Sequence, residues 1–332
     1  MKETILYHPL TKYVIYYPLY FIGKIAFKIF KITPSWSFFA FRRLYCLTKG
    51  KINHTISRKI SNSIGKYDIN NAPNEVIPDF DIHTAIKSIE KYGYYRLPAL
   101  MDETNIGKLR QLGHTCTCHV ESNNQFDGTE SVFNMNELKG NRYFATDQSL
   151  MSSGEVLDIL GSHRLLNLAQ EFLGCKPILD LVLMWWLTNY DNNDSSKSAQ
   201  YFHFDMDRPR FLKVFFYLTD VDEENGPHIY AKSSNNEKPA QLYKSRRFKD
   251  AEIETHYQVD HIKGKAGTIL LVNTSGFHKG GIVTKDPRLI LQLEYSNSLF
   301  GATYPNYKVM ANSEIFKKAK AIFPRAFQLF TS

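Results

Sequence analysis

The sequence has few cysteines and no long hydrophobic run. Four cysteines in 332 residues are too few for a disulfide framework, which favours a reducing compartment such as the cytoplasm. No segment reaches the ~18 uncharged apolar residues that a membrane span needs. The longest uncharged run near the N-terminus, residues 13–23, contains Pro18. No secretory signal pattern is evident, so we do not expect secretion.

Acidic residues are almost absent from the first 60 residues. This N-terminal arm holds eleven Lys or Arg and one acid, Glu3, while the remaining 272 residues hold 30 bases and 32 acids. The net charge of +8 therefore resides in the arm, which also carries thirteen of the 46 aromatic residues. A basic, aromatic segment is typical of a surface that meets an anionic membrane, and nucleic acid is not the expected partner.

Residues 19–32 predict an amphipathic helix within this arm. Lysines recur at helical spacing, at Lys24, Lys28 and Lys31. Isoleucines occupy another side, at Ile22, Ile25, Ile29 and Ile32. Such a helix either lies in a membrane interface or packs on its own domain with solvated lysines, and the sequence leaves both open. The first alternative places the protein peripherally on the inner face of a membrane.

The rest of the chain predicts a linker followed by one large domain. Residues 61–80 are polar and rich in Asn and Pro, which is typical of a linker. Helical patterns occur at 81–91, 103–112, 155–173 and 313–328, and short apolar runs at 178–190, 210–220, 228–232, 256–262, 267–273 and 288–297. Six or more short strands favour a sandwich or jelly roll. We therefore expect residues 81–332 to form a mainly β double-stranded β-helix with flanking helices.

His203 and Asp205 lie two residues apart between two apolar runs. On a strand, residues i and i+2 point to the same face, so this imidazole and carboxylate can share one metal ion. They would supply two ligands of a 2-His-1-carboxylate triad, which suits non-haem Fe(II). The spacing alone is a weak signal, because His119 and Glu121 repeat it.

Two downstream residues favour the pair at His203. His278 follows an apolar run in a glycine-bearing turn, where a third ligand can point inward, and Arg288 opens the next strand ten residues later. A guanidinium that points into a barrel needs a carboxylate partner, and a planar bidentate group satisfies it best. The next histidine after the pair at His119 is His163, and no arginine follows it about ten residues later.

Three motifs surround these residues: HFD at 203–205, DVDEENGP at 220–227 and GTILLVNTSGFHKGG at 267–281. With them, the segment 202–288 resembles the phytanoyl-CoA dioxygenase family of Fe(II)/2-oxoglutarate oxygenases. Residues 91–112 are similar to the opening strand and helix of that family, so the resemblance covers roughly 85–300. Two departures concern the substrate more than the chemistry. Lys232-Ser233-Ser234 replaces the usual Gly-Ser-His, and Phe202 precedes the ligand pair.

The resemblance implies a complete set of roles. His203, Asp205 and His278 hold Fe(II), Arg288 pairs with the distal carboxylate of 2-oxoglutarate, and O2 serves to hydroxylate a small or lipid-linked substrate. Halogenating relatives have a small residue in place of the carboxylate ligand, so Asp205 disfavours halogenation. Two rival functions remain open: a non-catalytic jelly-roll binding protein, and a membrane-tethering protein whose barrel is a scaffold.

Four other residues are weaker candidates for substrate contacts. Trp185 and Trp186 lie on the strand that leads toward the metal pair, and Arg208 and Arg210 follow Asp205. Neighbouring strand residues face opposite sides, so at least one of the two tryptophans belongs to the core. The two arginines either bind an acidic substrate group or lie solvated in a loop.

Overall fold

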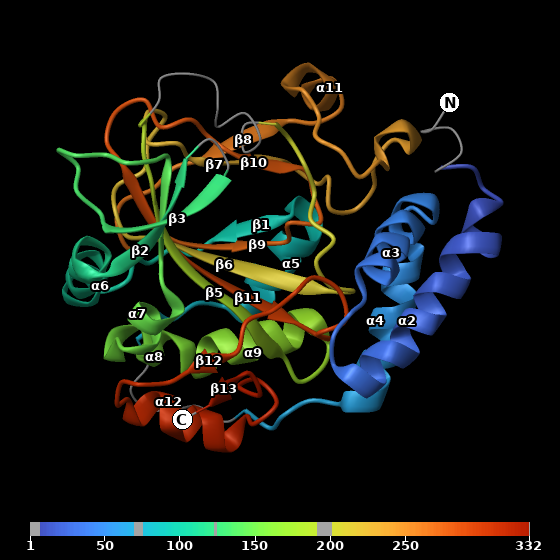
Figure 1. Ribbon diagram of the computed structural model, residues 1–332, viewed down its shortest axis with the longest axis horizontal. Helices are drawn as coiled ribbons and strands as arrows, with labels where there is room; N and C mark the ends of the chain where they lie inside the picture. Colours follow the sequence, from blue (N-terminus) through green and yellow to red (C-terminus); the bar gives the residue numbers. More distant parts are fainter. Residues whose placement is uncertain (1–6, 70–75, 123–124, 191–200, 332) are drawn as a thin grey trace.

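The six predicted strand runs after residue 177 all form strands of two antiparallel sheets (Figure 1). The computed structural model describes residues 7–69, 76–122, 125–190 and 201–331. The large sheet has the order β1-β9-β6-β11-β5-β4-β2-β3, and the small sheet has the order β10-β7-β8. This architecture confirms the expected double-stranded β-helix with flanking helices.

The strands differ in how well the sequence predicted them. Those of the large sheet are β1 (Tyr94–Arg96), β2 (Thr117–Ser122), β3 (Gln125–Val132), β4 (Arg142–Ala145), β5 (Ile178–Leu187), β6 (Phe211–Tyr217), β9 (Ile269–Val272) and β11 (Arg288–Ser296). The small sheet consists of β7 (His228–Ala231), β8 (Val259–Ile262) and β10 (His278–Gly280), and a third pair joins β12 (Tyr307–Lys308) to β13 (Phe330–Thr331). Strands β2, β3 and β4 were not predicted, because none of them contains a long apolar run.

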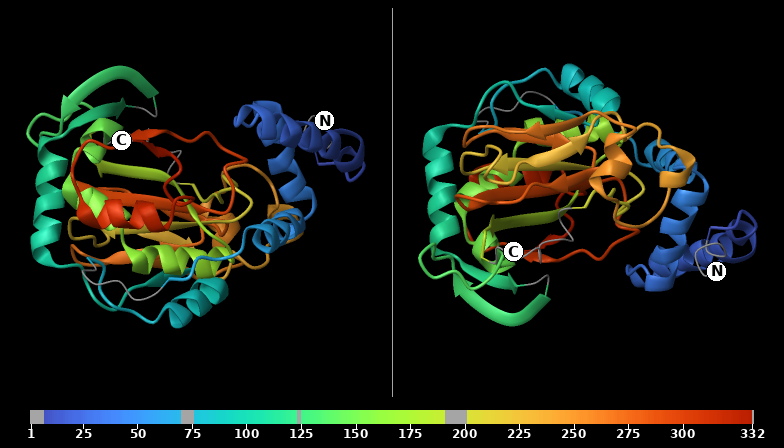
Figure 2. Two further views of the ribbon diagram at one scale, coloured as in Figure 1. Left: turned by 90° about the horizontal axis from the view of Figure 1, so that it is seen from below. Right: turned by 90° about the horizontal axis from the view of Figure 1, so that it is seen from above.

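Helices cover one side of the large sheet, and its apolar side chains pack against them (Figures 1 and 2). The helices after the N-terminal region are α5 (Ile82–Tyr92), α6 (Glu103–Thr115), α7 (Asp147–Met151), α8 (Gly154–Leu160), α9 (His163–Leu173), η3 (Ala240–Leu242), α11 (Asp250–Glu254) and α12 (Glu314–Ile322). The single helix predicted over 155–173 is two helices. Ser162 begins α9 with a hydroxyl that accepts a hydrogen bond from the Leu165 amide, so the chain turns there.

The N-terminal arm folds into a helical unit rather than an extended tail. It consists of η1 (Lys12–Tyr16), α2 (Tyr17–Phe30), α3 (Ser35–Leu47) and α4 (Lys51–Ile64). Helices α2 and α3 meet closely at Gly23, where an added Cβ would lie 1.8 Å from the Ser37 Oγ. Helix α4 runs past the expected arm boundary at residue 60, and residues 70–75 of the expected linker lie outside the described residues.

This helical unit stands at one end of the molecule and shares two apolar clusters with the barrel (Figures 1 and 2). In one cluster the Phe300 ring lies edge-on to Tyr20 and Phe41, with centroids 5.4 and 5.8 Å apart. In the other, Tyr45 lies 5.6 Å from Phe204, the residue between the two predicted ligands. Among the described residues, no helix is long and apolar enough to span a membrane.

Candidate active site

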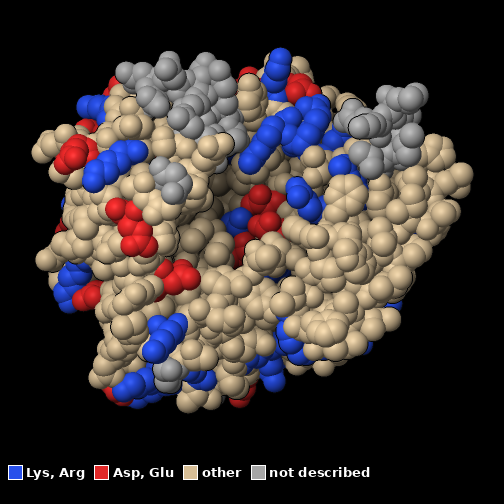
Figure 3. Space-filling model, viewed as in Figure 1, with Lys and Arg blue, Asp and Glu red and all other residues tan. Residues whose placement is uncertain are grey.

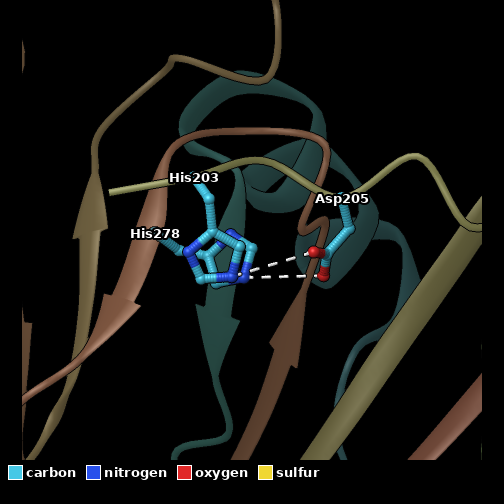
Figure 4. A group of neighbouring side chains, drawn as sticks. All are labelled: His203, Asp205 and His278. Carbon is cyan, nitrogen blue, oxygen red and sulfur yellow. Dashed lines mark ion pairs between the residues drawn. The ribbon is translucent and has the colours of Figure 1, made fainter. Parts of the chain in front are cut away.

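Backbone pairing brings His203, Asp205 and His278 together (Figure 4). His203 and His278 exchange backbone hydrogen bonds of 3.0 and 2.9 Å, which extends the small sheet beyond β10. The His203 Nε2 lies 3.8 Å from the Asp205 Oδ1, and the His278 Nε2 lies 3.5 Å from the Asp205 Oδ2. Within the described part of the chain, this is the one group of three or more His, Cys, Asp or Glu with metal-site geometry.

Both imidazoles present the Nε2 atom to the centre of the group. The Nδ1 of His203 lies 3.2 Å from the Tyr201 carbonyl oxygen, and the Nδ1 of His278 lies 3.0 Å from the Gly276 carbonyl oxygen. A carbonyl at Nδ1 favours the tautomer whose Nε2 lone pair is free for a metal. Burial lowers the pKa of His203 to about 4 and that of His278 to about 3, so both rings are neutral at pH 7.

Lys213 fixes the carboxylate of Asp205. Its ammonium lies 2.8 Å from the Asp205 Oδ2, 3.3 Å from Asp207 and 3.5 Å from Glu294. Burial opposes ionisation of Asp205, but Lys213 and the two imidazoles hold the pKa of its carboxyl below the usual value. The sequence analysis did not single out Lys213. The sequence did contain an indication of its importance, because Lys213 is the one charged residue in the otherwise apolar run FLKVFFY, which forms β6.

A cavity of about 460 Å³ opens beside the three ligand candidates. Its mouth is the hollow at the centre of Figure 3, where acidic and basic side chains lie at the floor. Arg288, at the start of β11, lines this cavity and is buried, with 4% of its surface exposed. Burial lowers the pKa of Arg288 to about 10, so the guanidinium stays charged at neutral pH.

The Arg288 guanidinium is incompletely satisfied by the protein. Its Nε and Nη1 atoms are buried without a hydrogen-bond partner among the described residues. A buried, charged donor without a partner is costly, so such atoms usually meet a ligand or ion. An anion with two acceptor oxygens, such as a carboxylate, fits this place in the cavity. The residues present therefore fit both a divalent metal and an anionic co-substrate.

Two further features of the cavity concern its aromatic wall and a third histidine. Trp185 and Phe144 stack with centroids 6.0 Å apart, and both line the cavity. His228, at the start of β7, also lines it; its ring stacks 5.6 Å from that of His278, and its buried Nε2 has no partner among the described residues. The sequence analysis missed His228, because only the pairing of β7 with β10 brings it to the ligands.

The other three substrate candidates lie elsewhere. Trp186 is in the core, where its Nε1 donates to the Gly113 carbonyl and its ring stacks on Phe133. The Arg208 Nε lies 2.5 Å from the carboxylate of Asp180, so this arginine forms an ion pair with a buried acid in the core. Arg210 lies away from the cavity, with its guanidinium over the Phe172 ring.

Known proteins similar to this chain include several solved structures. The epimerase SnoN from nogalamycin biosynthesis, described as non-heme and alpha-ketoglutarate dependent, is 16% identical over 65% of this chain and 82% of its own, with a TM-score of 0.48. HygX from Streptomyces hygroscopicus, solved with nickel and 2-oxoglutarate, is 14% identical over 66% and 88%, with a TM-score of 0.48. EctD from S. alaskensis, solved with 2-oxoglutarate and 5-hydroxyectoine, is 16% identical over 69% and 79%, with a TM-score of 0.46.

The sequence itself matches no curated protein, but it matches a family model. The model is described as phytanoyl-CoA dioxygenase (PhyH), and the match covers residues 89–290. This segment is more than half of the chain and includes all three ligand candidates and Arg288. The chain therefore belongs to the phytanoyl-CoA dioxygenase family of Fe(II)- and 2-oxoglutarate-dependent oxygenases.

Proposed function

We propose that this oxygenase hydroxylates a small or lipid-linked substrate. The observation that carries the proposal is the convergence, in one cavity, of the His203, Asp205 and His278 ligand set with the Arg288 guanidinium, whose Nε and Nη1 have no hydrogen-bond partner among the described residues. Neither a binding protein nor a membrane tether needs a ligand triad and a buried anion site side by side.

Each residue has a defined part in this proposal. The two imidazoles and the Asp205 carboxylate would hold Fe(II), and Lys213 would keep that carboxylate ionised and oriented. Arg288 would pair with the distal carboxylate of 2-oxoglutarate. When bound, iron with 2-oxoglutarate and O2 supplies the oxidation of a substrate C–H bond to C–OH, with release of succinate and CO2.

The cavity wall supports a substrate with an apolar portion. Trp185 and Phe144 form an aromatic wall, and Leu183, Phe215 and Ile290 extend the apolar lining. Such a wall can hold a hydrocarbon or sugar-ring carbon near the ligand candidates and exclude water from the reacting centre.

We further propose that the enzyme is located in the cytoplasm, peripherally on a membrane. The four free, buried cysteines agree with a reducing compartment.

The direct test is succinate formation from 2-oxoglutarate by the full-length protein supplied with Fe(II) and O2. His203→Ala should abolish it, whereas His119→Ala should leave it unchanged, because His119 heads the same His-x-acid pattern but is half-exposed outside the cavity. Products that gain one oxygen atom, compared in extracts with and without the enzyme, would identify the substrate. Equal succinate formation by the wild type and His203→Ala would refute the proposal.

A further inference from the structure

Helices η1 and α2 leave an apolar face in solvent. Of the twenty exposed large hydrophobic side chains in the described residues, twelve lie between residues 10 and 39. Ile22, Ile25 and Ile29, which form one side of α2, are 57%, 60% and 66% exposed. Only Tyr20 and Gly23 of α2 are buried, against α3 and Phe300. Among the described residues, the predicted isoleucine face is therefore not used for packing, and soluble proteins seldom leave such a patch without a partner.

Helices η1 to α4 carry positive charge that no acid of the described residues balances by an ion pair. Residues 7–64 contain ten Lys or Arg and no Asp or Glu. A groove of about 740 Å³ between α2 and α4 is lined by Lys12, Lys24, Lys49, Lys51 and Lys59, none of which forms an ion pair with a described residue. Burial, together with Lys28 and Lys59, lowers the pKa of Lys24, so these lysines disfavour one another's charge. An anion in the groove would relieve this repulsion.

The apolar face and the lysine groove adjoin each other. Phe21 connects them, because it lines the groove, is 57% exposed and directly precedes Ile22 in α2. A helix with an apolar side flanked by lysines matches the interface of an anionic bilayer, where acyl chains meet lipid phosphates. Nucleic acid would engage the lysines but leave the isoleucines in water. A protein partner would have no need for so many unpaired cations beside the apolar side chains.

We propose that η1, α2 and the groove between α2 and α4 form a docking face for an anionic lipid bilayer, with Ile22, Ile25 and Ile29 among the acyl chains and the groove lysines at the lipid phosphates. Together the apolar face and the lysines would hold the enzyme peripherally, with no membrane-spanning segment.

Docking on this face would bring the active site near the membrane. Figure 1 shows α2 and the β2–β3 hairpin at opposite ends of the molecule, and both views of Figure 2 show them projecting to the same side. Figure 3 shows a hollow beside the largely uncharged surface of the helices. A lipid-linked substrate could then reach the cavity from the bilayer. This last consequence rests on the proposed hydroxylase function, whereas docking itself does not.

Vesicle flotation of the full-length protein tests the docking face without any turnover. We expect flotation with phosphatidylglycerol-containing vesicles, weakening with salt, and little with phosphatidylcholine alone. Ile25→Asp combined with Ile29→Asp should lower the bound fraction at least tenfold, whereas Met310→Asp, at an exposed methionine in the C-terminal part of the chain, should not. Substitution is preferable to removing residues 1–60, because truncation would open both shared apolar clusters.

The charged half of the face needs its own variant pair. Lys24→Glu with Lys59→Glu should reduce binding to the anionic vesicles at least tenfold, while Lys87→Glu with Lys318→Glu makes the same charge change on distant exposed lysines and should have less than a twofold effect. Equal losses in both pairs would show attraction by net charge alone and would overturn the assignment of the groove.

A fluorescent label reports which side enters the lipid. All four native cysteines are buried, so Ile25→Cys can be labelled selectively with an environment-sensitive dye. Its emission should shift to the blue with anionic vesicles, and that of a label at Met310→Cys should not. No flotation at low salt, or RNA binding that persists in Ile25→Asp/Ile29→Asp while vesicles are ignored, would overturn the inference. Succinate formation in all these variants separates such a failure from a failure of the proposed chemistry.

Discussion

The barrel and the N-terminal helical unit handle charge in opposite ways. In the barrel, buried charges converge on a cavity, and Lys213 contacts three carboxylates there. In the helical unit, ten basic residues face no acid of their own segment, and isoleucines point into solvent. The family match covers the barrel and omits the helical unit. The comparison shows that Lys213 of the barrel is neutralised within the chain, whereas the groove lysines of the helical unit have no ion-pair partner among the described residues and its isoleucines remain exposed.

The largest effect on stability should come from the buried lysine of the barrel. Lys213→Met would leave Asp205, Asp207 and Glu294 without their shared cation, which should lower the free energy of unfolding by ~3–5 kcal/mol. Lys59→Met, in the helical unit, should change it by less than ~0.5 kcal/mol, because Lys59 is exposed and has no ion pair with a described residue. Denaturant unfolding measures the free energy change of both variants. Equal changes would contradict the stated difference between the barrel and the helical unit.

The next effect concerns the co-substrate. Arg288→Ala should raise the KM for 2-oxoglutarate by about 100-fold, since two charged hydrogen bonds contribute ~3 kcal/mol. Arg288→Lys should recover only part of this, because a point charge cannot reproduce the bidentate fork. Arg110→Ala, at a surface arginine paired with Glu103, is the control. An unchanged KM in Arg288→Ala would move the anion site to another cation of the cavity, with Lys279 the first alternative.

The attachment of the helical unit can be weakened at Gly23. Gly23→Ala places a Cβ against Ser37, so α2 must move from α3, and this overpacking should cost ~1–3 kcal/mol of local stability. Hydrogen exchange should show faster opening of α2 with little change in β11. Adding Ser37→Gly should restore protection; if it does not, the contact at Gly23 is not what holds α2.

The smallest effect should come from His228. His228 lines the cavity beside His278, and its buried Nε2 has no partner among the described residues, so we expect it to bond to an oxygen atom of a bound molecule. His228→Leu should therefore raise the KM for 2-oxoglutarate or for the substrate several-fold, worth ~1 kcal/mol, and His228→Gln should recover part of the loss. Identical kinetic constants for the wild type and His228→Leu would limit His228 to packing.

The sequence predicted the parts of this molecule that depend on local pattern. The apolar runs gave the positions of β5, β6 and β11, and Ser313 caps α12 as expected. Spacing together with the family resemblance selected the three ligand candidates and Arg288, which the structure brings to one cavity and whose roles remain predictions. The roles of Lys213 and His228 were not predictable, because they depend on strand pairings that close the barrel.

The packing of the helical unit on the barrel also could not be predicted from the sequence. The amphipathic pattern predicted α2, but its attachment depends on Phe300, some 270 residues away in the chain. Local periodicity cannot reveal such a contact. Nor could it show that the isoleucine face stays in solvent after the unit has packed on the barrel.

Anaerobic titration with Fe(II), followed by 2-oxoglutarate, tests the assignment of the active site most directly. The wild-type protein should bind about one Fe(II), and 2-oxoglutarate should then produce a visible charge-transfer absorption. Asp205→Ala should lose the metal and the absorption, whereas Arg288→Ala should keep the metal and need far more 2-oxoglutarate. Full iron occupancy and an unchanged absorption in Asp205→Ala would contradict the account.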